Sequence, residues 1–500
     1  MGELRNKVNT WVGECLADYS SNVRGNKVIH DTILGTNQFY QHEISVIDSP
    51  ILQRLRRISQ VDVVSLVWPS SNHNRFEHSL GVATIGHKFV AALNSKGIIP
   101  DKEYKQCIYN IRMAGILHDT GHGPFSHMSE AIFKHCEDMR KEIEEDHKLK
   151  ATAPNPHEVL SYLIVTSEAF KEFYEQEINK KYEVELDLEF IGDSIIGYIN
   201  DPERAFLFDI INGAFDADKL DYIQRDSHFT GLQLMLDLDR LFYTLDTVPV
   251  HVNIRERKEM KLTVDVSGVS SLEQIVFDKM MLQTTVYNHH KVRAAEGLFH
   301  TIFFEALQTQ GIIPGKNFES AADFLYITDD DILSLGSSGG KPGSIYADSL
   351  LKRRLPKRAL MISTRSITED TRQNMWKFMS LENKPQEVIA LREKIAKEAA
   401  KTQPDIKPSD IWVDVPRVAK FKEGDQWPIK IEGEPLGYLT LREFFPIDQW
   451  VKAFSENKWV AHVFTWECFR ESVNRASKKI IEAEYGIQLN EFATIGCKFK

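Results

Sequence analysis

The sequence predicts a mainly α-helical protein, with an all-helical core followed by a smaller mixed α+β lobe. From Lys27 to about Gln308, apolar residues recur at three- and four-residue spacing and Pro and Gly are scarce, which is typical of amphipathic helices. After Leu355 the chain changes to short strand-like segments between helix-like stretches. No segment repeats at a fixed period, which argues against a solenoid or a propeller.

Four parts are expected along the chain: a helical or partly ordered lead-in over 1–26, a helical domain over 27–310, a loop-rich connection over 311–355 and an α+β lobe over 356–500. The apolar residues of 108–117 predict a mostly buried helix that ends by Gly121. GIIPGK and GSSGGKPGS have the Gly, Ser and Pro content of loops. In the lobe we expect strands at 357–363, 410–416, 427–433 and 436–441, and helices at 385–401 and 468–485.

Composition narrows the class of protein. The 500 residues are 42% hydrophobic and 27% charged, which is ordinary for a globular protein. The net charge of −11 makes nucleic acid a disfavoured partner. Five scattered cysteines indicate neither a disulfide framework nor a thiolate zinc site, and they suit a reducing cytoplasm. Without a secretory signal or an apolar run near ~20 residues, we expect a cytoplasmic protein with no membrane partner.

The most informative segment is LHDTGHGPFSH, residues 117–127. It contains three histidines and an aspartate, namely His118, Asp119, His122 and His127. Neutral imidazole and carboxylate are ligands for divalent metals such as Mn, Fe, Ni or Zn. A single histidine is usually a structural residue, but four such groups at the end of a helix favour a metal site.

Two further segments supply candidates for the same site. His78 lies in NRFEHSLG, at an expected helix start. DADKLDYIQRD brings Asp218, Asp221, Tyr222 and Asp226 near one helical face. Several carboxylates on an enclosed face require a compensating cation, water or metal. An exposed acidic stripe is the alternative interpretation of this helix.

The order of these residues resembles a known family. His78, then His118-Asp119, then Asp218 matches the H…HD…D pattern of the HD-domain metal-dependent phosphohydrolases. NRFEHSLGV, LHDTGHGPFSH and DADKLDYIQRD resemble the deoxynucleoside triphosphate triphosphohydrolase branch, which the mammalian SAM-and-HD-domain enzyme shares with its bacterial dGTPase-like relatives. The resemblance runs from about Lys27 to Arg293, so no SAM domain is expected before it. It implies an all-helical HD phosphohydrolase core with a smaller mixed lobe.

The resemblance implies a reaction and a set of residues for it. The family hydrolyses dNTPs to deoxynucleoside and inorganic triphosphate, in dNTP pool control or phage defence. The implied cofactor is one divalent metal (Mn, Fe, Mg, Ni or Zn), with His78, His118, Asp119 and Asp218 as its ligands. The implied catalytic residues are His122, His127 and His157, with Glu130 at the position of a family aspartate. A histidine would protonate the departing 5′ oxygen, and we favour His127 or His157 for this role.

Substrate-binding residues are implied in the same way. They are the cations Arg75, Lys219 and Arg293 for the triphosphate, and Gln60, Val61, Tyr222 and Asp226 for the sugar and base. Guanidinium and ammonium groups suit phosphate oxygens. The segment VYNHHKVR departs from the family by having Asn288 in place of a tyrosine, so no base preference is predicted.

DSPILQRLR (48–56) resembles the family's site for an activating guanine nucleotide. The implied residues are Lys27, Val28, Asp48, Gln53, Arg56, Val67 and Trp68. His30 departs from the family asparagine, and an ordinary amphipathic helix is the alternative interpretation. A bound activator would join subunits into a homodimer or homotetramer.

Two other functions stay open at this point. One is an HD phosphohydrolase or phosphodiesterase that acts on another nucleotide or on single-stranded nucleic acid. The other is a non-catalytic nucleotide sensor, which the complete set of expected ligands and catalytic histidines disfavours.

Overall fold

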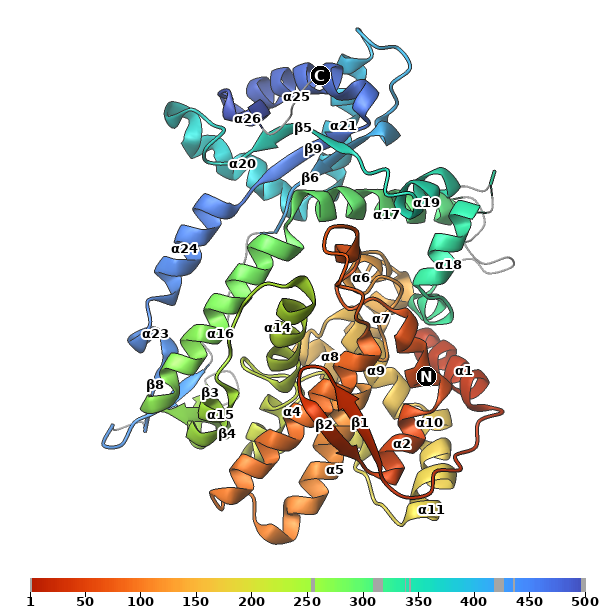
Figure 1. Cartoon of the computed structure of the whole chain (residues 1–500), viewed down its shortest axis with the longest axis vertical. Helices are drawn as coiled ribbons and strands as arrows, with labels where there is room; N and C mark the ends of the chain where they lie inside the picture. Colours follow the sequence, from red (N-terminus) through yellow and green to blue (C-terminus); the bar gives the residue numbers. More distant parts are fainter. Residues whose placement is uncertain are drawn as a thin grey trace. The chain divides into compact units, whose positions relative to one another are not determined.

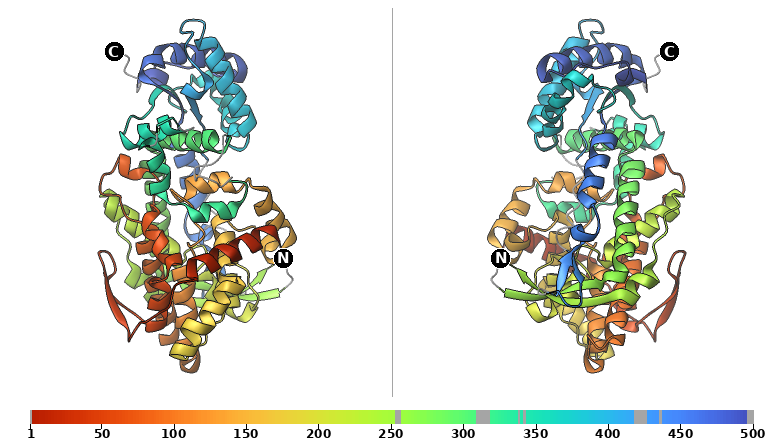
Figure 2. Two further views of the ribbon diagram at one scale, coloured as in Figure 1. Left: turned by 90° about the vertical axis from the view of Figure 1, so that its right-hand side faces the viewer. Right: turned by 90° about the vertical axis from the view of Figure 1, so that its left-hand side faces the viewer.

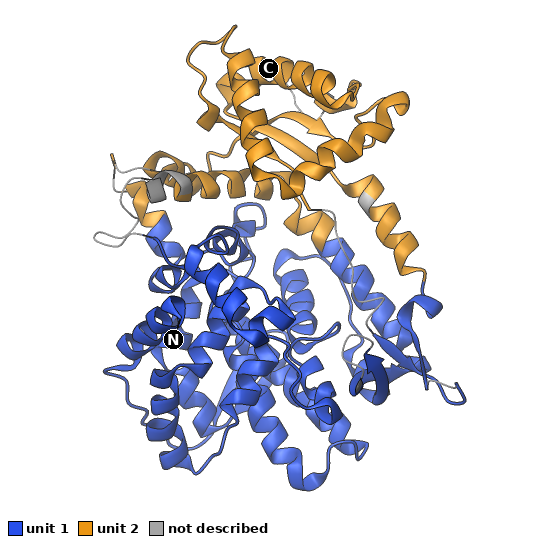
Figure 3. Ribbon diagram, turned by 180° about the vertical axis from the view of Figure 1, so that it is seen from behind, with its two compact units in different colours: residues 1–282, 310–332, 422–445 blue, residues 283–309, 333–421, 446–500 orange. Residues whose placement is uncertain are grey.

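A computed structural model describes residues 2–252, 257–308, 318–337, 339–340, 343–417, 427–434 and 437–495. Over these residues the chain is mainly α-helical, as predicted (Figure 1). It forms two compact units, each made from several segments (Figure 3): unit 1 is 1–282, 310–332 and 422–445, and unit 2 is 283–309, 333–421 and 446–500. None of the described helices combines the length and apolar character that crossing a bilayer requires.

Four helices position the candidate site in unit 1: α4 (Arg75–Ser95), α5 (Asp101–Leu117), α9 (Pro156–Thr166) and α14 (Ala217–Thr230). Helix α4 packs against both α5 and α14, and α12 (Leu188–Ile195) packs against α5 and α9. The expected buried helix at 108–117 is the C-terminal part of α5. The other helices of this unit are α1 (Glu3–Leu16), α2 (Gln41–Ile47), α3 (Pro50–Gln53), α6 (His127–Phe133), α7 (Glu137–Glu145), α8 (His147–Thr152), α10 (Glu168–Phe173), α11 (Lys180–Tyr182), α13 (Ala205–Asp209), α15 (Leu238–Thr244), α16 (Val269–Leu282) and α23 (Leu441–Phe444).

Side-chain caps fix where three of the site helices begin. The Asn74 side chain accepts from a backbone N–H of α4, and the Asp216 side chain does the same for α14. Helix α9 has a capping box in which Asn155 and Glu158 satisfy each other's backbone groups, with Pro156 in the first turn. These caps satisfy N–H groups that a helix start otherwise leaves unbonded. They therefore hold the first turns of these helices in register.

Unit 1 also contains strands where mostly helical structure was predicted. β1 (Lys27–Asp31) and β2 (Gly35–Phe39) form an antiparallel hairpin that stands out from the helices of unit 1 in both views of Figure 2. β3 (Leu245–Val252) and β4 (Arg257–Asp265) form a second antiparallel pair. Their alternating polar and apolar residues have the period of a strand, but each run is short within a long helical stretch.

The expected strands at 427–433 and 436–441 form as β7 (Pro428–Lys430) and β8 (Tyr438–Thr440). They do not join the C-terminal lobe. β7 pairs in parallel with β4, and β8 pairs with β7, which gives the sheet order β3-β4-β7-β8 in unit 1. Strand pairing between distant segments depends on backbone hydrogen bonds that leave no local signal in the sequence.

Unit 2 is the mixed α+β part. Its antiparallel sheet has the order β5 (Lys357–Ile362), β9 (Ala461–Thr465), β6 (Ile411–Asp414). Leu360, Ile395, Val463 and Ile481 lie in its core and are buried. The strands β5 and β6 were predicted and β9 was not. Its helices are α17 (His290–Gln308), α19 (Ser344–Leu351), α20 (Met375–Met379), α21 (Pro385–Ala399), α24 (Ile447–Lys458), α25 (Arg470–Tyr485) and α26 (Phe492–Ile495).

The segment expected as a loop-rich connection contains regular structure in its described residues. α18 (Asp329–Ser334) and α19 form there. GIIPGK lies outside the described residues, as does part of GSSGGKPGS. The glycine and serine residues near these helices predicted loops, so the short helices between them were not predicted.

Candidate metal centre

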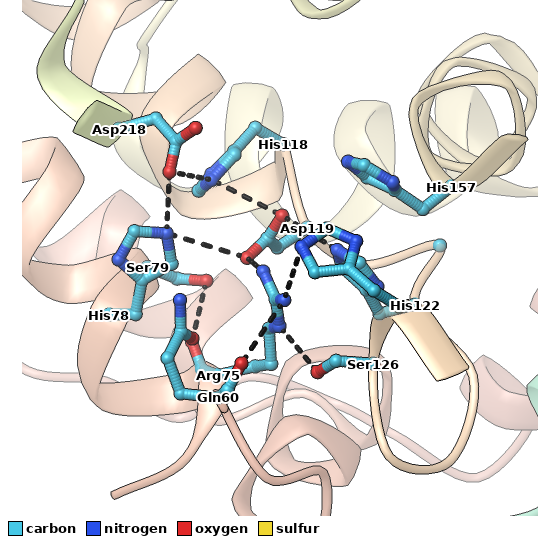
Figure 4. A network of polar contacts seen from close by, with 12 residues as sticks. Gln60, Arg75, His78, Ser79, His118, Asp119, His122, Ser126, His157 and Asp218 are labelled. Atoms are coloured by element: carbon cyan, nitrogen blue, oxygen red, sulfur yellow. Dashed lines mark hydrogen bonds and ion pairs between the residues drawn. The ribbon is translucent and has the colours of Figure 1, made fainter. Parts of the chain in front are cut away.

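The four predicted metal ligands converge from three helices, as Figure 4 shows. His78 is on the first turn of α4, His118 and Asp119 follow the last residue of α5, and Asp218 is on the first turn of α14. His78 Nε2 lies 3.0 Å from Asp218 Oδ1 and 3.5 Å from Asp119 Oδ2. His118 Nε2 lies 3.3 Å from Asp119 Oδ1 and 3.9 Å from Asp218 Oδ1. These separations suit atoms that share one ion at about 2.0–2.2 Å each.

Hydrogen bonds at the other ring nitrogen orient both histidines. His78 Nδ1 lies 2.8 Å from Asp221 Oδ2, and His118 Nδ1 lies 2.8 Å from the carbonyl oxygen of Gly115. Because these acceptors take the Nδ1 proton, Nε2 of each ring presents its lone pair to the site. Both Nε2 atoms are buried without a well-directed hydrogen bond. A divalent cation would satisfy them, so the donor set fits a metal.

The electrostatics favour a cation at the same point. Burial on its own would lower the pKa of His78, but Asp218, Asp221 and Asp119 raise it to about 10. Burial would raise the pKa of Asp119, but Arg75 and the nearby histidines hold it well below its usual value. His78 and His118 likewise hold the pKa of Asp218 below its usual value despite burial. The acidic groups thus stay ionised, and the excess negative charge that holds a proton on His78 would attract a metal ion instead.

Close helix packing makes this geometry dependent on two glycines. A Cβ at Gly81 of α4 would overlap the side chains of Asp221 and Arg225 on α14. A Cβ at Gly121 would overlap the His157 carbonyl oxygen and lie 2.6 Å from Ser161 N on α9. Only glycine leaves room for the Asp221 and Arg225 side chains at the first position and for the α9 backbone at the second.

The predicted catalytic residues form a second group beside the ligands. The rings of His122 and His157 stack with centroids 3.9 Å apart. Glu130 Oε2 lies 2.9 Å from His127 Nδ1 and 3.0 Å from His157 Nδ1, so one carboxylate serves both rings. The side chain of Glu130 is therefore long enough to reach both His127 and His157. His122, His127, Glu130 and His157 lie close enough together to be able to hold a cation themselves.

These neighbours give the histidines different protonation states. Burial would lower the pKa of His157, but Glu130 raises it to about 9. Burial, Arg75 and His157 all hold the pKa of His122 well below its usual value. At neutral pH His157 therefore carries a proton that it could donate, and His122 is neutral.

The predicted phosphate ligands are engaged with acidic groups in this structure. Arg75 is buried and donates from Nη1 to Asp119 Oδ2 at 2.7 Å and from Nε to Ser126 Oγ at 2.8 Å. Lys219 Nζ donates to Asp216 Oδ2 at 2.5 Å. Arg293 belongs to unit 2, where its guanidinium contacts other side chains of that unit.

Two of the predicted sugar and base residues, Gln60 and Asp226, are linked through a histidine that was not predicted. His73 Nε2 lies 2.8 Å from Asp226 Oδ1, and the His73 carbonyl oxygen accepts from the backbone N–H of Gln60 at 3.1 Å. Gln60 and Val61 are buried, and Tyr222 is half-buried. His73 lies just before the recognised motif, in SSNHNRFEHS, and nothing in the local pattern distinguishes it.

Two more buried groups support the site from behind. Arg225 donates to both oxygens of Asp221, at 2.7 and 2.9 Å, and to Asp31 Oδ2 at 2.9 Å. Asp329 accepts from the backbone N–H of Ser59 at 2.9 Å and of Phe125 at 2.6 Å. The spacing of Asp221 and Arg225 by four residues was visible in the sequence. The role of Asp329 was not, because its partners lie more than 200 positions away.

The predicted activator residues lie at the surface of unit 1 in two contacting pairs. Lys27 Nζ donates to Asp48 Oδ2 at 3.1 Å, and Arg56 Nε donates to Gln53 Oε1 at 2.8 Å. The Arg56 guanidinium also stacks on the Phe76 ring. Val28 is 64% exposed, and both Val67 and Trp68 are half-buried.

Family models assign the class of domain. Residues 75–188 match the model described as HD domain, and residues 251–490 match the model described as HD associated region. The chain therefore carries an HD domain followed by an HD associated region.

Known proteins confirm the resemblance stated from the sequence. The chain is 28% identical over 316 residues to the deoxynucleoside triphosphate triphosphohydrolase SAMHD1 homolog of Dictyostelium discoideum, which covers 62% of this chain and 55% of that protein. It is 28% identical over 299 residues to SAMHD1 of Homo sapiens, which covers 56% of this chain and 44% of that protein. It is 25% identical over 440 residues to an uncharacterized protein of Methanocaldococcus jannaschii, at 88% and 79% coverage. The chain thus spans about half the length of these SAMHD1 relatives.

Proposed function

We propose that this protein is a metal-dependent phosphohydrolase that converts dNTPs to deoxynucleoside and inorganic triphosphate. The observation that carries the proposal is the convergence of His78, His118, Asp119 and Asp218 beside a protonated His157. The SAMHD1 relatives are named deoxynucleoside triphosphate triphosphohydrolases, which supports the choice of dNTPs and of triphosphate as product.

Different residues would bind the metal and donate the proton in this reaction. A divalent metal held by the four ligands would polarise an α-phosphoryl oxygen and lower the pKa of a bound water. His157 donates its proton to the 5′ oxygen as the bond to phosphorus breaks, and Glu130 balances the charge on its ring. His127, which contacts the same carboxylate, is the alternative donor.

Substrate binding requires the predicted cations to exchange partners. Arg75 and Lys219, the two predicted cations that belong to unit 1, would each leave part of an acidic contact for a phosphate oxygen. A guanidinium group can bind such oxygens in a bidentate way. Asp226 would accept from the 3′ hydroxyl, and Gln60 and Val61 would line the sugar and base. Tyr222 would exclude a 2′ hydroxyl, so we expect ATP to be turned over far more slowly than dATP.

The test combines metal analysis with product analysis. Wild type should contain about one divalent metal per chain and release triphosphate as its first product from dATP. Asp119→Ala should lose both the metal and the activity, and Asp239→Ala, on α15, should lose neither. Orthophosphate or pyrophosphate as the first product would exclude this reaction. Turnover without bound metal would exclude the proposed mechanism.

We also propose a guanine nucleotide as activator at Asp48, Gln53 and Arg56, with subunit assembly as its effect. Asp48 would accept from N1 and the exocyclic amine of guanine, and Arg56 would donate to its O6 or N7. A ligand shifts assembly only through its higher affinity for the oligomer. Added GTP should increase dATP hydrolysis and the sedimentation coefficient in wild type but not in Asp48→Ala. Equal rates with and without GTP would reject this site and leave the hydrolase proposal intact.

A further inference from the structure

Unit 2 contains a pocket that the proposed reaction does not use. Its volume is about 440 Å³, and it lies between α17, α21 and strand β6. Pockets of a few hundred Å³ are the size that small-molecule sites have. All of its lining residues belong to unit 2, whereas the candidate metal ligands belong to unit 1.

One side of the pocket is a rigid apolar wall. Trp412 donates from Nε1 to Thr301 Oγ1 at 2.9 Å, and its ring lies against Gly297. A Cβ at Gly297 would lie 2.8 Å from Trp412 Cδ1, so the indole occupies the space of a missing side chain. Val388 and Ile389 of α21 continue the apolar lining. The wall is thus fixed by packing before any ligand binds.

The charged groups of the pocket differ in how well they are satisfied. Arg293 is neutralised by Asp414, whose Oδ1 accepts from it at 2.6 and 3.0 Å, and by Glu296. Arg392 makes no hydrogen bond or ion pair with any residue that the structure describes, and its Nε is buried. Burial accordingly lowers the pKa of Arg392. The nearby charge of Glu393 does not offset this burial. A half-buried guanidinium that no carboxylate contacts directly is costly, and an anion in the pocket would relieve that cost.

We propose that this pocket binds a small organic anion, with a carboxylate or phosphate group on Arg392 and a flat apolar body along Val388 and Ile389. The acidic residues Glu296 and Glu382 also line the pocket, and they would repel a polyanion such as a triphosphate. The ligand is therefore a molecule with one anionic group on an apolar frame. This site does not depend on the proposed hydrolase activity.

Three probes on the same naphthalene frame test the proposal by equilibrium dialysis against the full chain: 2-naphthoate, 2-naphthyl phosphate and the neutral 2-naphthamide, which has the shape of the carboxylate. We expect at least one anion to bind at one site per chain, about tenfold or more tighter than the amide, since charge-assisted hydrogen bonds exceed neutral ones. The stronger anion identifies the group that the site accepts. In R392Q the preference for the anion should disappear.

Two further variants separate the pocket from other surfaces. I389W fills the apolar side and should abolish binding of all three probes. R475Q removes an exposed arginine of α25 in the same unit and should bind as wild type does. Circular dichroism and thermal unfolding confirm that each variant is folded. Absence of saturable binding, equal affinity for the amide, or unchanged affinity in folded R392Q and I389W would each overturn the proposal.

Discussion

Replacing Glu130 with glutamine tests how one carboxylate controls the proton on His157. Glu130 Oε2 lies 3.0 Å from His157 Nδ1. Burial pushes the pKa of His157 down, and Glu130 is the main group that raises it to about 9. In Glu130→Gln the burial stays and the charge is gone, so the pKa should fall to about 6.5 or below, which is the ordinary value for histidine.

The sign and size of the effect on rate follow from that change. A general acid must be protonated, so activity is lost as the pH rises through the pKa of His157. At pH 8 the protonated fraction is about 0.9 for a pKa of 9 and about 0.03 for a pKa of 6.5, so the variant should lose about 30-fold in rate. At pH 6 both rings are mostly protonated, and the two rates should differ by less than about twofold from this cause.

The assay is the rate of triphosphate release from dATP between pH 5.5 and 9.5, at saturating metal. Glu130→Asp keeps the charge and should recover part of the activity at the alkaline side of the pH–rate profile. Glu137→Gln changes an exposed carboxylate that contacts Lys141, and it should leave the profile unchanged. If the pH at which Glu130→Gln loses half of its activity on the alkaline side stays within about half a pH unit of wild type, His157 does not supply the proton under control of Glu130.

Three further predictions concern the supports of the site and of unit 2. Asp221→Asn removes the charge behind a ligating histidine, so metal affinity should fall about 10- to 100-fold, measured by metal content after dialysis against a chelator series. Gly121→Ala forces a Cβ into the His157 carbonyl oxygen and should cost about 1–3 kcal/mol in urea unfolding, whereas Gly339→Ala meets open space and should cost almost nothing. The pKa of Asp414 is lowered from 3.8 to about 2, because Arg293 outweighs its burial. A carboxyl group whose pKa is lowered by folding stabilises the fold at pH values above its pKa in the unfolded chain. Asp414→Asn should therefore lower the free energy of unfolding by about 2 kcal/mol at pH 7, and this difference should vanish as the pH falls from about 4 to 2.

The sequence predicted the helical class and the residues of the candidate centre because both depend on patterns of residues close together in the chain. Helical periodicity depends on neighbours three and four positions apart, and each metal ligand lies in a short sequence motif of characteristic composition. His118 and Asp119 were identifiable for this reason alone. The same locality explains the predicted strands β5 to β8, whose apolar runs are bounded by turn residues.

The tertiary structure decided which groups serve one another. The sequence could not tell that Asp221 fixes the tautomer of His78, or that Glu130 serves both His127 and His157. It also did not predict that β7 pairs with β4. A side chain's partner is set by packing between helices far apart in the chain, as where the absent Cβ of Gly81 admits Asp221, and only the folded arrangement of backbones determines those approaches.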